Sequence, residues 1–141
     1  LKIGQLLWSN IPEAEIEDKI FDIVNQLNMG VELISAPIER EKLAKLNLIA
    51  GRKAKASTAY ATAKKYLTVG IELLTKDCWE TQYDLTLSLY ELDTEVAYLN
   101  GNFEQMEISA EVVLQQAKTI LEKVKVYEIK ITAYASQNRL R

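Results

Sequence analysis

Residues 26–34 read QLNMGVELI, and forty residues later residues 66–74 read YLTVGIELL. Leucine, glycine, glutamate and a second leucine recur at matching places, and the other apolar positions are exchanged conservatively. A period near forty residues is typical of proteins built from stacked supersecondary units. The sequence therefore predicts a stack of helix pairs, an architecture that offers a binding surface but brings no chemistry of its own.

The residue types that are missing exclude several kinds of site. The chain has 141 residues, with no histidine and a single cysteine, Cys78. Catalysis by a serine–histidine or cysteine–histidine pair and a structural zinc site are therefore excluded within this sequence. The five glycines stand apart from one another and form no phosphate-binding loop. We expect no catalytic residue, no metal and no cofactor in this chain, and hence no enzyme activity of its own.

Composition favours a helical protein without a membrane span. Alanine, leucine, glutamate and lysine are plentiful, and all four favour helices. No uninterrupted apolar run approaches the roughly 18 residues of a membrane span, and a lone cysteine fits a reducing compartment. We therefore expect a cytoplasmic location and no membrane contact. Because the sequence begins at Leu1 and stops at Arg141 inside a helical pattern, we expect it to be a segment of a longer polypeptide.

Apolar residues recur with the period of an α-helix along the chain, and polar or proline-containing breaks separate the runs. We expect one domain over 1–141, divided into units at about 1–34, 38–75 and 78–117 and a partial unit at 124–141. Asn100-Gly101 is expected to form a helix–helix turn, because helical periodicity continues on both sides of it. Asp77 and Glu80 have the spacing of a capping box at the start of the third unit.

The apolar pattern also predicts which side chains turn inward. The first long helix is expected to continue to Ile34, and the next one to bury Ile49 beside its leucines. The last helix is expected to turn Val124, Tyr127, Ile131 and Tyr134 inward. Gly30, Gly51 and Gly70 stand inside helical patterns, where we expect them to allow close approach of neighbouring helices.

Residues at fixed spacings in two of the predicted units resemble the tetratricopeptide repeat. The small and bulky positions of that motif are matched in the first of them by Gly51, Ala54, Ala63, Leu67 and Gly70, and in the next by Tyr90, Ala97, Gly101, Met106, Ala110 and Val113. The interval here is about 40 to 43 residues, whereas the usual repeat has 34. The resemblance implies an all-α, tetratricopeptide-like superhelix of about three antiparallel helix pairs.

A second resemblance covers nearly the whole chain. Residues 43–60, 82–87 and 110–118 resemble segments of large cyanobacterial signalling kinases, which join a serine/threonine kinase, an ATPase, a helical repeat region, a GAF sensor and a histidine kinase. The match is to the helical repeat region, and no kinase, ATPase or GAF motif lies in this sequence. The resemblance implies that this chain is a non-catalytic module for protein–protein or interdomain contact in signal transduction, and that kinase activity and ATP binding belong to the parent protein.

Charge is divided between two segments of the chain. Residues 39–65 carry eight basic and two acidic residues, a balance of +6, whereas residues 77–111 carry nine acidic residues and no basic one. In the repeat register, Lys45, Arg52 and Lys55 lie on the inner curve, and Glu91 and Glu95 hold the corresponding face of the next unit. The two sets either pair with each other or leave a basic groove for a small anionic effector.

The candidate binding residues are therefore Lys45, Arg52, Lys55, Glu91 and Glu95, with Tyr98 as a possible aromatic contact. The expected partner is a protein, either a neighbouring domain of the parent or a signalling partner. Nucleic acid is not expected, because the net charge is −3. The alternative function is a sensor domain that binds a small anionic effector on the basic inner face. The sequence leaves the oligomeric state open.

Overall fold

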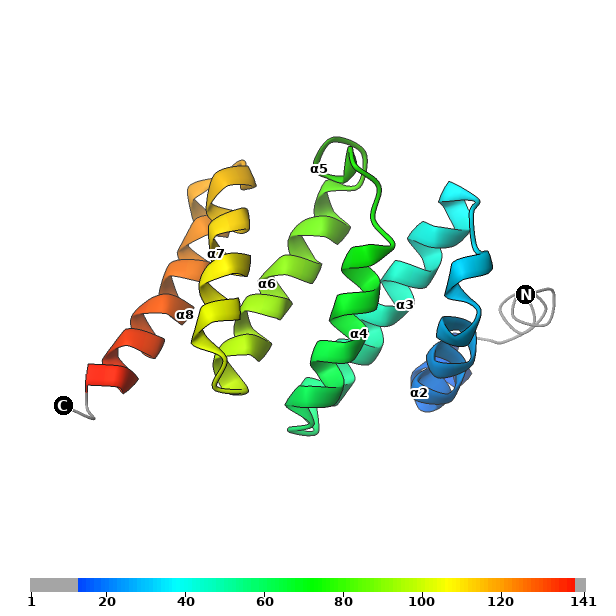
Figure 1. The fold of residues 1–141 in the computed structure, drawn as a ribbon, viewed down its shortest axis with the longest axis horizontal. Helices are drawn as coiled ribbons and strands as arrows, with labels where there is room; N and C mark the ends of the chain where they lie inside the picture. The colour runs from blue at the N-terminus through cyan, green and yellow to red at the C-terminus, as the bar shows by residue number, and fades with distance from the viewer. Residues whose placement is uncertain (1–12, 139–141) are drawn as a thin grey trace.

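The protein is described over residues 13–138 by a computed structural model, and these residues form only helices and connecting segments. The elements are α2 (Glu13–Met29), the 3-10 helix η1 (Val31–Leu33), α3 (Pro37–Ala56), α4 (Tyr60–Glu72), α5 (Cys78–Thr81), α6 (Tyr83–Leu99), α7 (Phe103–Gln116) and α8 (Ile120–Asn138). They lie side by side in one elongated row that follows the order of the sequence (Figure 1). The predicted all-α fold is confirmed over this range.

Two helix pairs, α3 with α4 and α6 with α7, make the most extensive contacts in the row. A three-residue turn joins each pair, so its helices run antiparallel. Thr58 in the first turn and Gly101 in the second have positive φ angles of 61° and 77°. Asn102 then caps α7 by accepting a hydrogen bond of 3.1 Å from the backbone N–H of Gln105. The predicted helix–helix turn at Asn100-Gly101 is confirmed, and the pairing is compatible with a tetratricopeptide-like stack.

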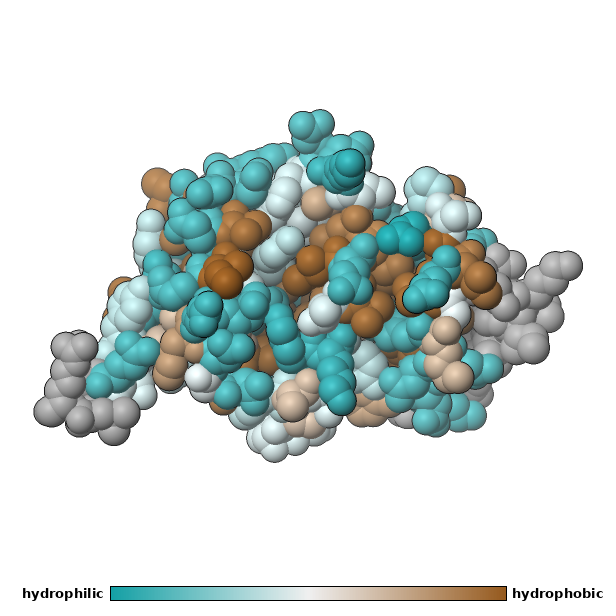
Figure 2. Space-filling view, viewed as in Figure 1, coloured by the Kyte–Doolittle hydropathy of each residue, from teal (hydrophilic) through white to brown (hydrophobic). Residues whose placement is uncertain are grey.

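The hydrophobic core runs as a seam along the stack. One cluster of buried side chains joins α2, α3, α4 and α6, with Leu43, Leu67 and Leu89 fully buried. Two smaller clusters continue the seam through α6, α7 and α8. Figure 2 shows hydrophobic surface still visible between hydrophilic side chains over the middle of the stack. Each helix pair thus depends on its neighbours to cover its apolar side chains.

Most residues at the predicted repeat positions lie in this seam. Gly51, Ala54, Ala63, Leu67, Gly70, Ala97, Met106, Ala110 and Val113 are buried, Tyr90 is half-buried, and Gly101 is exposed in its turn. At Gly70 a Cβ atom would lie 2.9 Å from Leu89 Cδ2, so a larger residue would force the fully buried Leu89 side chain to shift. This contact offsets the roughly 1 kcal/mol that glycine costs against alanine in a helix interior.

The first long helix is shorter than predicted. It ends at Met29, and Gly30 stands in the turn before η1, so this glycine does not serve a contact inside a helix. Ile34 is buried all the same, because the turn returns it to the seam. The part of the first predicted unit that covers residues 1–12 lies outside the described residues.

The predicted capping box at Asp77 and Glu80 is wrong. The Asp77 side chain makes no capping hydrogen bond and instead accepts one of 2.6 Å from the hydroxyl of Thr75. The helix after it is only the single turn α5, because Gln82 has non-helical φ and ψ angles of −135° and 45° and separates α5 from α6. A capping box of the predicted kind occurs at α8, where Thr119 and Glu122 exchange hydrogen bonds of 3.2 Å.

Two predictions of inward-facing residues are also wrong. Ile49 is 38% exposed, because at 100° per residue it falls on the polar face of α3 with Lys45 and Arg52. The residues of the last helix predicted to face inward are all exposed: Val124, Tyr127, Ile131 and Tyr134. This helix has two apolar faces, and the one that packs on α6 and α7 carries the buried Val126 and Ala133.

Arg40 fastens the start of α3 to the end of α4. Its guanidinium group donates hydrogen bonds to the carbonyl oxygens of Ile34, Glu72 and Leu73, at 3.0, 3.1 and 3.3 Å. The last carbonyls of a helix lack partners within the helix, and here the arginine supplies them. The same contact ties η1 to the stack.

We expect Arg40→Met to lower the free energy of unfolding by about 1 to 2 kcal/mol, because three carbonyl oxygens lose a charged donor. Urea denaturation followed by circular dichroism measures the loss. Lys45→Met is the matched control: it removes a charge of the same helix whose ion pair with Glu41 is exposed and worth about 0.3 to 0.5 kcal/mol. Equal losses in the two variants would contradict the role given to Arg40.

Candidate functional site

The structure brings Lys55 of α3 and Glu95 of α6 together across the contact between neighbouring helix pairs. Lys55 Nζ lies 2.7 Å from Glu95 Oε1, and about a third of each side chain remains exposed. Both residues belong to the oppositely charged segments singled out in the sequence. This pair favours the interpretation that the two segments face each other.

The other two basic candidates are arranged differently. Lys45 lies 3.5 Å from Glu41 of its own helix, one turn away, and is largely exposed. Arg52 is exposed on α3, and its charge acts on the carboxylate of Glu91 on α6. Two of the three basic side chains, Lys45 and Lys55, are thus paired with a carboxylate, and the charge of the third acts on Glu91.

Glu91 is half-buried between helices. Burial raises the pKa of its carboxyl above the ordinary value, Glu122 adds to the rise, and the charges of Lys125 and Arg52 oppose it. Its surroundings thus combine side chains from α3, α6 and α8. Lys125 of α8 was not among the residues singled out in the sequence.

The raised pKa gives a pH-dependent prediction. A carboxyl whose pKa is higher in the folded than in the unfolded state contributes stability below its ordinary pKa, near 4.5, and this contribution is lost as the pH rises through the folded value. We expect Glu91→Gln to melt above the wild type at neutral pH, with the difference shrinking towards about pH 4. Melting curves across this range test the prediction. Glu111→Gln, on the exposed face of α7, is the control, and a pH-independent difference at position 91 would contradict the prediction.

Tyr98 lines a groove between α6 and α8, which we call the α6–α8 groove. Its volume is about 310 Å³, and it is lined by Glu95, Tyr98, Leu99, Lys125, Glu128, Ile129 and Thr132. The ring of Tyr98 is half-buried and lies 6.3 Å from that of Phe103 between centroids. Glu95 belongs both to this groove and to the pair with Lys55, so the groove continues the charged surface. An aromatic ring beside both signs of charge suits contact with a protein chain.

The lining residues of α8 were missed in the sequence. Lys125, Glu128 and Thr132 recur at helical spacing, but nothing in the sequence alone separates such polar residues from an ordinary solvated face. Only the packing of α8 against α6 makes them part of a groove.

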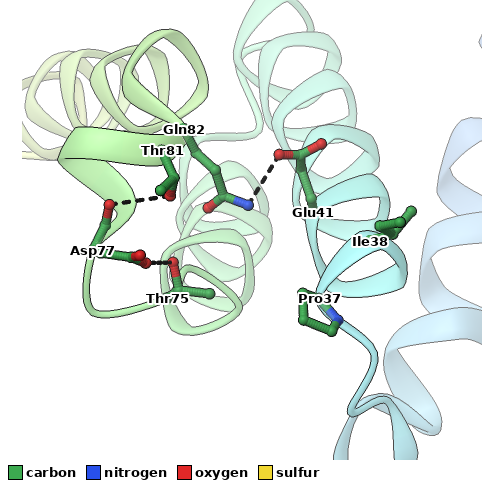
Figure 3. A pocket seen from close by; sticks show the side chains of 7 residues that line it. All are labelled: Pro37, Ile38, Glu41, Thr75, Asp77, Thr81 and Gln82. Carbon is green, nitrogen blue, oxygen red and sulfur yellow. Dashed lines mark hydrogen bonds between the residues drawn. The ribbon is translucent and has the colours of Figure 1, made fainter.

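A second cavity, of about 350 Å³, lies where the α4–α6 connection meets the start of α3 (Figure 3). It is lined by Pro37, Ile38, Glu41, Thr75, Asp77, Thr81 and Gln82. Gln82 donates a hydrogen bond of 3.0 Å to Glu41, and the carboxylate of Asp77 is held by Thr75. The amide nitrogen of Gln82 thus links the start of α6 to α3, whereas its amide oxygen Oε1 is buried without a hydrogen-bond partner among the described residues.

Within the described range of 13–138, no cluster of three acidic, cysteine or histidine side chains is placed to hold a metal ion. Cys78 is buried, with a free thiol. None of the helices of this range combines the length and the hydropathy that a bilayer span requires.

Part of this chain is similar to a short stretch of a known signalling protein. The chain is similar to hybrid signal transduction histidine kinase G of Dictyostelium discoideum, with 33% identity over 108 aligned residues. The alignment covers 70% of this chain and 3% of that relative, so the chain spans a small part of the relative's length. No family model matches the chain, and no solved structure matches it. The similarity supports a signal-transduction kinase setting for a helical module of this kind.

Proposed function

We propose that this chain is a non-catalytic helical repeat module that binds protein within a signal-transduction protein kinase. The parent would be a large cytoplasmic kinase of the type that joins serine/threonine kinase, ATPase, GAF and histidine kinase domains. The partner would be one of these domains or a separate signalling protein. The proposal is supported by the similarity to a hybrid histidine kinase and by the stacked helix pairs, which suit contact with another protein.

The observation that carries the proposal is the α6–α8 groove. Tyr98 offers an aromatic anchor at its wall, and Glu95, Lys125 and Glu128 offer charges of both signs around it. Anchors of this kind, partly enclosed and ringed by polar side chains, dominate the energy of protein interfaces. A bound segment with its own mixed charges would meet complementary groups along the groove.

A small anionic effector is the weaker alternative. Lys55 is held by Glu95 and Lys45 by Glu41, so an anion would have to displace a carboxylate to reach either lysine. Thermal-shift screening with phosphate and nucleotides distinguishes the two functions, because a bound effector raises the melting temperature.

The proposal is tested by affinity capture with the 141-residue chain as bait and the purified kinase, ATPase and GAF domains of its parent as prey. We expect one of them to bind, and Tyr98→Ala together with Lys125→Glu to weaken the contact at least tenfold. Gln115→Ala on the exposed face of α7 is the matched control and should bind like the wild type. Absence of binding by every domain would exclude an interdomain contact, and equal binding by the double variant would remove the α6–α8 groove as the binding surface.

A further inference from the structure

The exposed face of α8 repeats a pattern that is covered elsewhere in the stack. Along each of α3, α6 and α8, five residues follow one another at intervals of four, three, four and three. On α3 they are Arg40, Ala44, Asn47, Gly51 and Ala54; on α6 they are Tyr83, Leu87, Tyr90, Thr94 and Ala97; on α8 they are Ile120, Val124, Tyr127, Ile131 and Tyr134. We call each set the stripe of its helix. A stripe with this spacing forms one continuous seam along a helix.

On α3 and α6 the stripe is covered by the next helix in the chain. A Cβ on Gly51 of α3 would lie 3.1 Å from Leu67 of α4, and a Cβ on Gly70 of α4 would lie 3.5 Å from Asn47. On α6, Leu87 belongs to a cluster with Ala110 and Val113 of α7. At the other end of that stripe, Ala97 packs in a cluster with Met106 of α7 and Ala133 of α8.

On α8 the corresponding stripe is both the most apolar of the three and the most exposed. Ile120, Val124, Tyr127, Ile131 and Tyr134 are 79, 39, 49, 66 and 42% exposed. Figure 1 shows α8 as the last helix of the row among the described residues. Tyr134 is held in place by its hydroxyl, which donates a hydrogen bond to Glu107 of α7. The hydrogen bond to α7 thus fixes the position of the Tyr134 side chain without any helix packed over the α8 stripe.

We propose that the α8 stripe is the docking face of an amphipathic helix of the same polypeptide, which packs antiparallel to α8 as α7 packs on α6. The occupant follows from continuity with the two existing interfaces, since each stripe there is covered by the next helix after a three-residue turn. The covering helices carry stripes of their own: Ala63, Leu67, Gly70 and Leu74 lie on α4, and Met106, Ala110, Val113 and Ala117 follow on α7.

The side chains of the α8 stripe also define the shape of the occupant. Tyr134 stands where α6 has Ala97, the residue that makes room for Met106. The docking helix must therefore begin with a small residue opposite Tyr134. Ile131 and Val124 then accept apolar side chains one and three turns further on.

A second copy of this chain fits less well in that orientation. In an antiparallel pairing of two α8 helices centred on Tyr127, Lys123 of one copy would lie level with Ile131 of the other, and Lys130 level with Val124, so a lysine would stand beside each of these apolar side chains. The inference does not depend on the proposed function, because it concerns how the stack continues and not what its inner face binds.

The test is a chain with one more helix. In this extended chain, Ser136 is followed by a copy of residues 100–117, which form the α6–α7 turn and α7. Ser136 is chosen because it corresponds to Leu99 at the end of α6. In the copy, the residue that corresponds to Met106 is changed to alanine, which leaves room for Tyr134. We expect this extended chain to remain monomeric and to melt roughly 5 °C or more above the 141-residue chain. An extension with glutamate at the counterparts of Ala110 and Val113 is the matched control and should give no gain.

Ile131→Glu locates the contact on the stripe. In the 141-residue chain this exposed side chain should tolerate the change without loss of melting temperature, whereas in the extended chain it should abolish the gain. Two results would overturn the inference: an extension that stabilises no more than its glutamate control, or a 141-residue chain that forms a dimer which Ile131→Glu dissociates. The second result would assign the stripe to another copy of the chain.

Discussion

Asp93→Ala is expected to lower the free energy of unfolding by about 3 to 5 kcal/mol, because it removes the acceptor shared by three helices. The carboxylate is 1% exposed. It lies 2.9 Å from Lys64 Nζ of α4, and it accepts hydrogen bonds from Ser109 and Gln105 of α7 at 2.6 and 3.4 Å. Without it, the buried Ser109 hydroxyl would lose the acceptor of its proton, Lys64 would lose its counter-ion, and a cavity would be left between the helices.

Thermal and urea denaturation measure this loss, which corresponds to a fall in melting temperature of roughly 10 to 20 °C for a chain of this size. Glu95→Ala is the matched control, since Glu95 lies on the same helix two residues later. Its pair with Lys55 is partly exposed and worth about 0 to 1 kcal/mol. Combining Asp93→Ala with Ser109→Ala should cost less than the sum of the two, because both remove one hydrogen bond. Equal losses for Asp93→Ala and Glu95→Ala would show that burial of Asp93 does not matter.

Asp93 also shows where sequence reasoning stops. It stands in an acidic segment between Glu91 and Glu95, and the charge pattern treats the three residues alike. Only the meeting of α4, α6 and α7 makes one of them a buried link, whereas the other two are half-buried. The packing of three helices is a tertiary property, and no local pattern in the chain carries it.

Other features were accessible from the sequence because they depend on local periodicity or on the repeat. The helical period predicted the all-α fold, and the glycines of the repeat coincided with close contacts at Gly51 and Gly70. The repeat register set Arg52 and Lys55 on a face that corresponds to that of Glu95 in the next unit, and the structure pairs Glu95 with Lys55, one turn beyond Arg52 on α3. A repeat of about forty residues thus locates a contact to within one helical turn, and this precision is too low to identify which basic residue pairs with Glu95.

The prediction of the buried face of the last helix was wrong for a different reason. It carries one apolar face with Val126 and Ala133 and another with Tyr127 and Ile131, and periodicity alone favours the larger side chains. The structure buries the smaller ones, because they allow α8 to approach α6 and α7. The sequence of a helix with two apolar faces does not determine which face is buried, because that depends on the neighbouring helices.

Gly51→Leu is expected to lower the melting temperature sharply, with a loss of about 3 kcal/mol through overpacking. A Cβ at this position would lie 3.1 and 3.2 Å from the Cδ2 and Cγ atoms of Leu67, and 3.6 Å from Leu92 Cδ2. Both leucines are buried, one on α4 and one on α6, so the added side chain must push two helices away from α3 at once. The better helix propensity of leucine offsets only about 1 kcal/mol of this cost.

Circular dichroism melts of Gly51→Leu and Ala61→Leu make the comparison. Ala61 lies on the exposed face of α4, so its replacement adds a leucine to a helix without entering the seam and should leave the melt nearly unchanged. Gly51→Ala is the intermediate case, in which Leu67 has to move by a few tenths of an ångström. A graded loss from alanine to leucine at position 51 would locate the strain at the α3–α4 contact. An unchanged melt for Gly51→Leu would mean that α3 does not touch α4 there, and the packing within this helix pair would lose the contact assigned to Gly51.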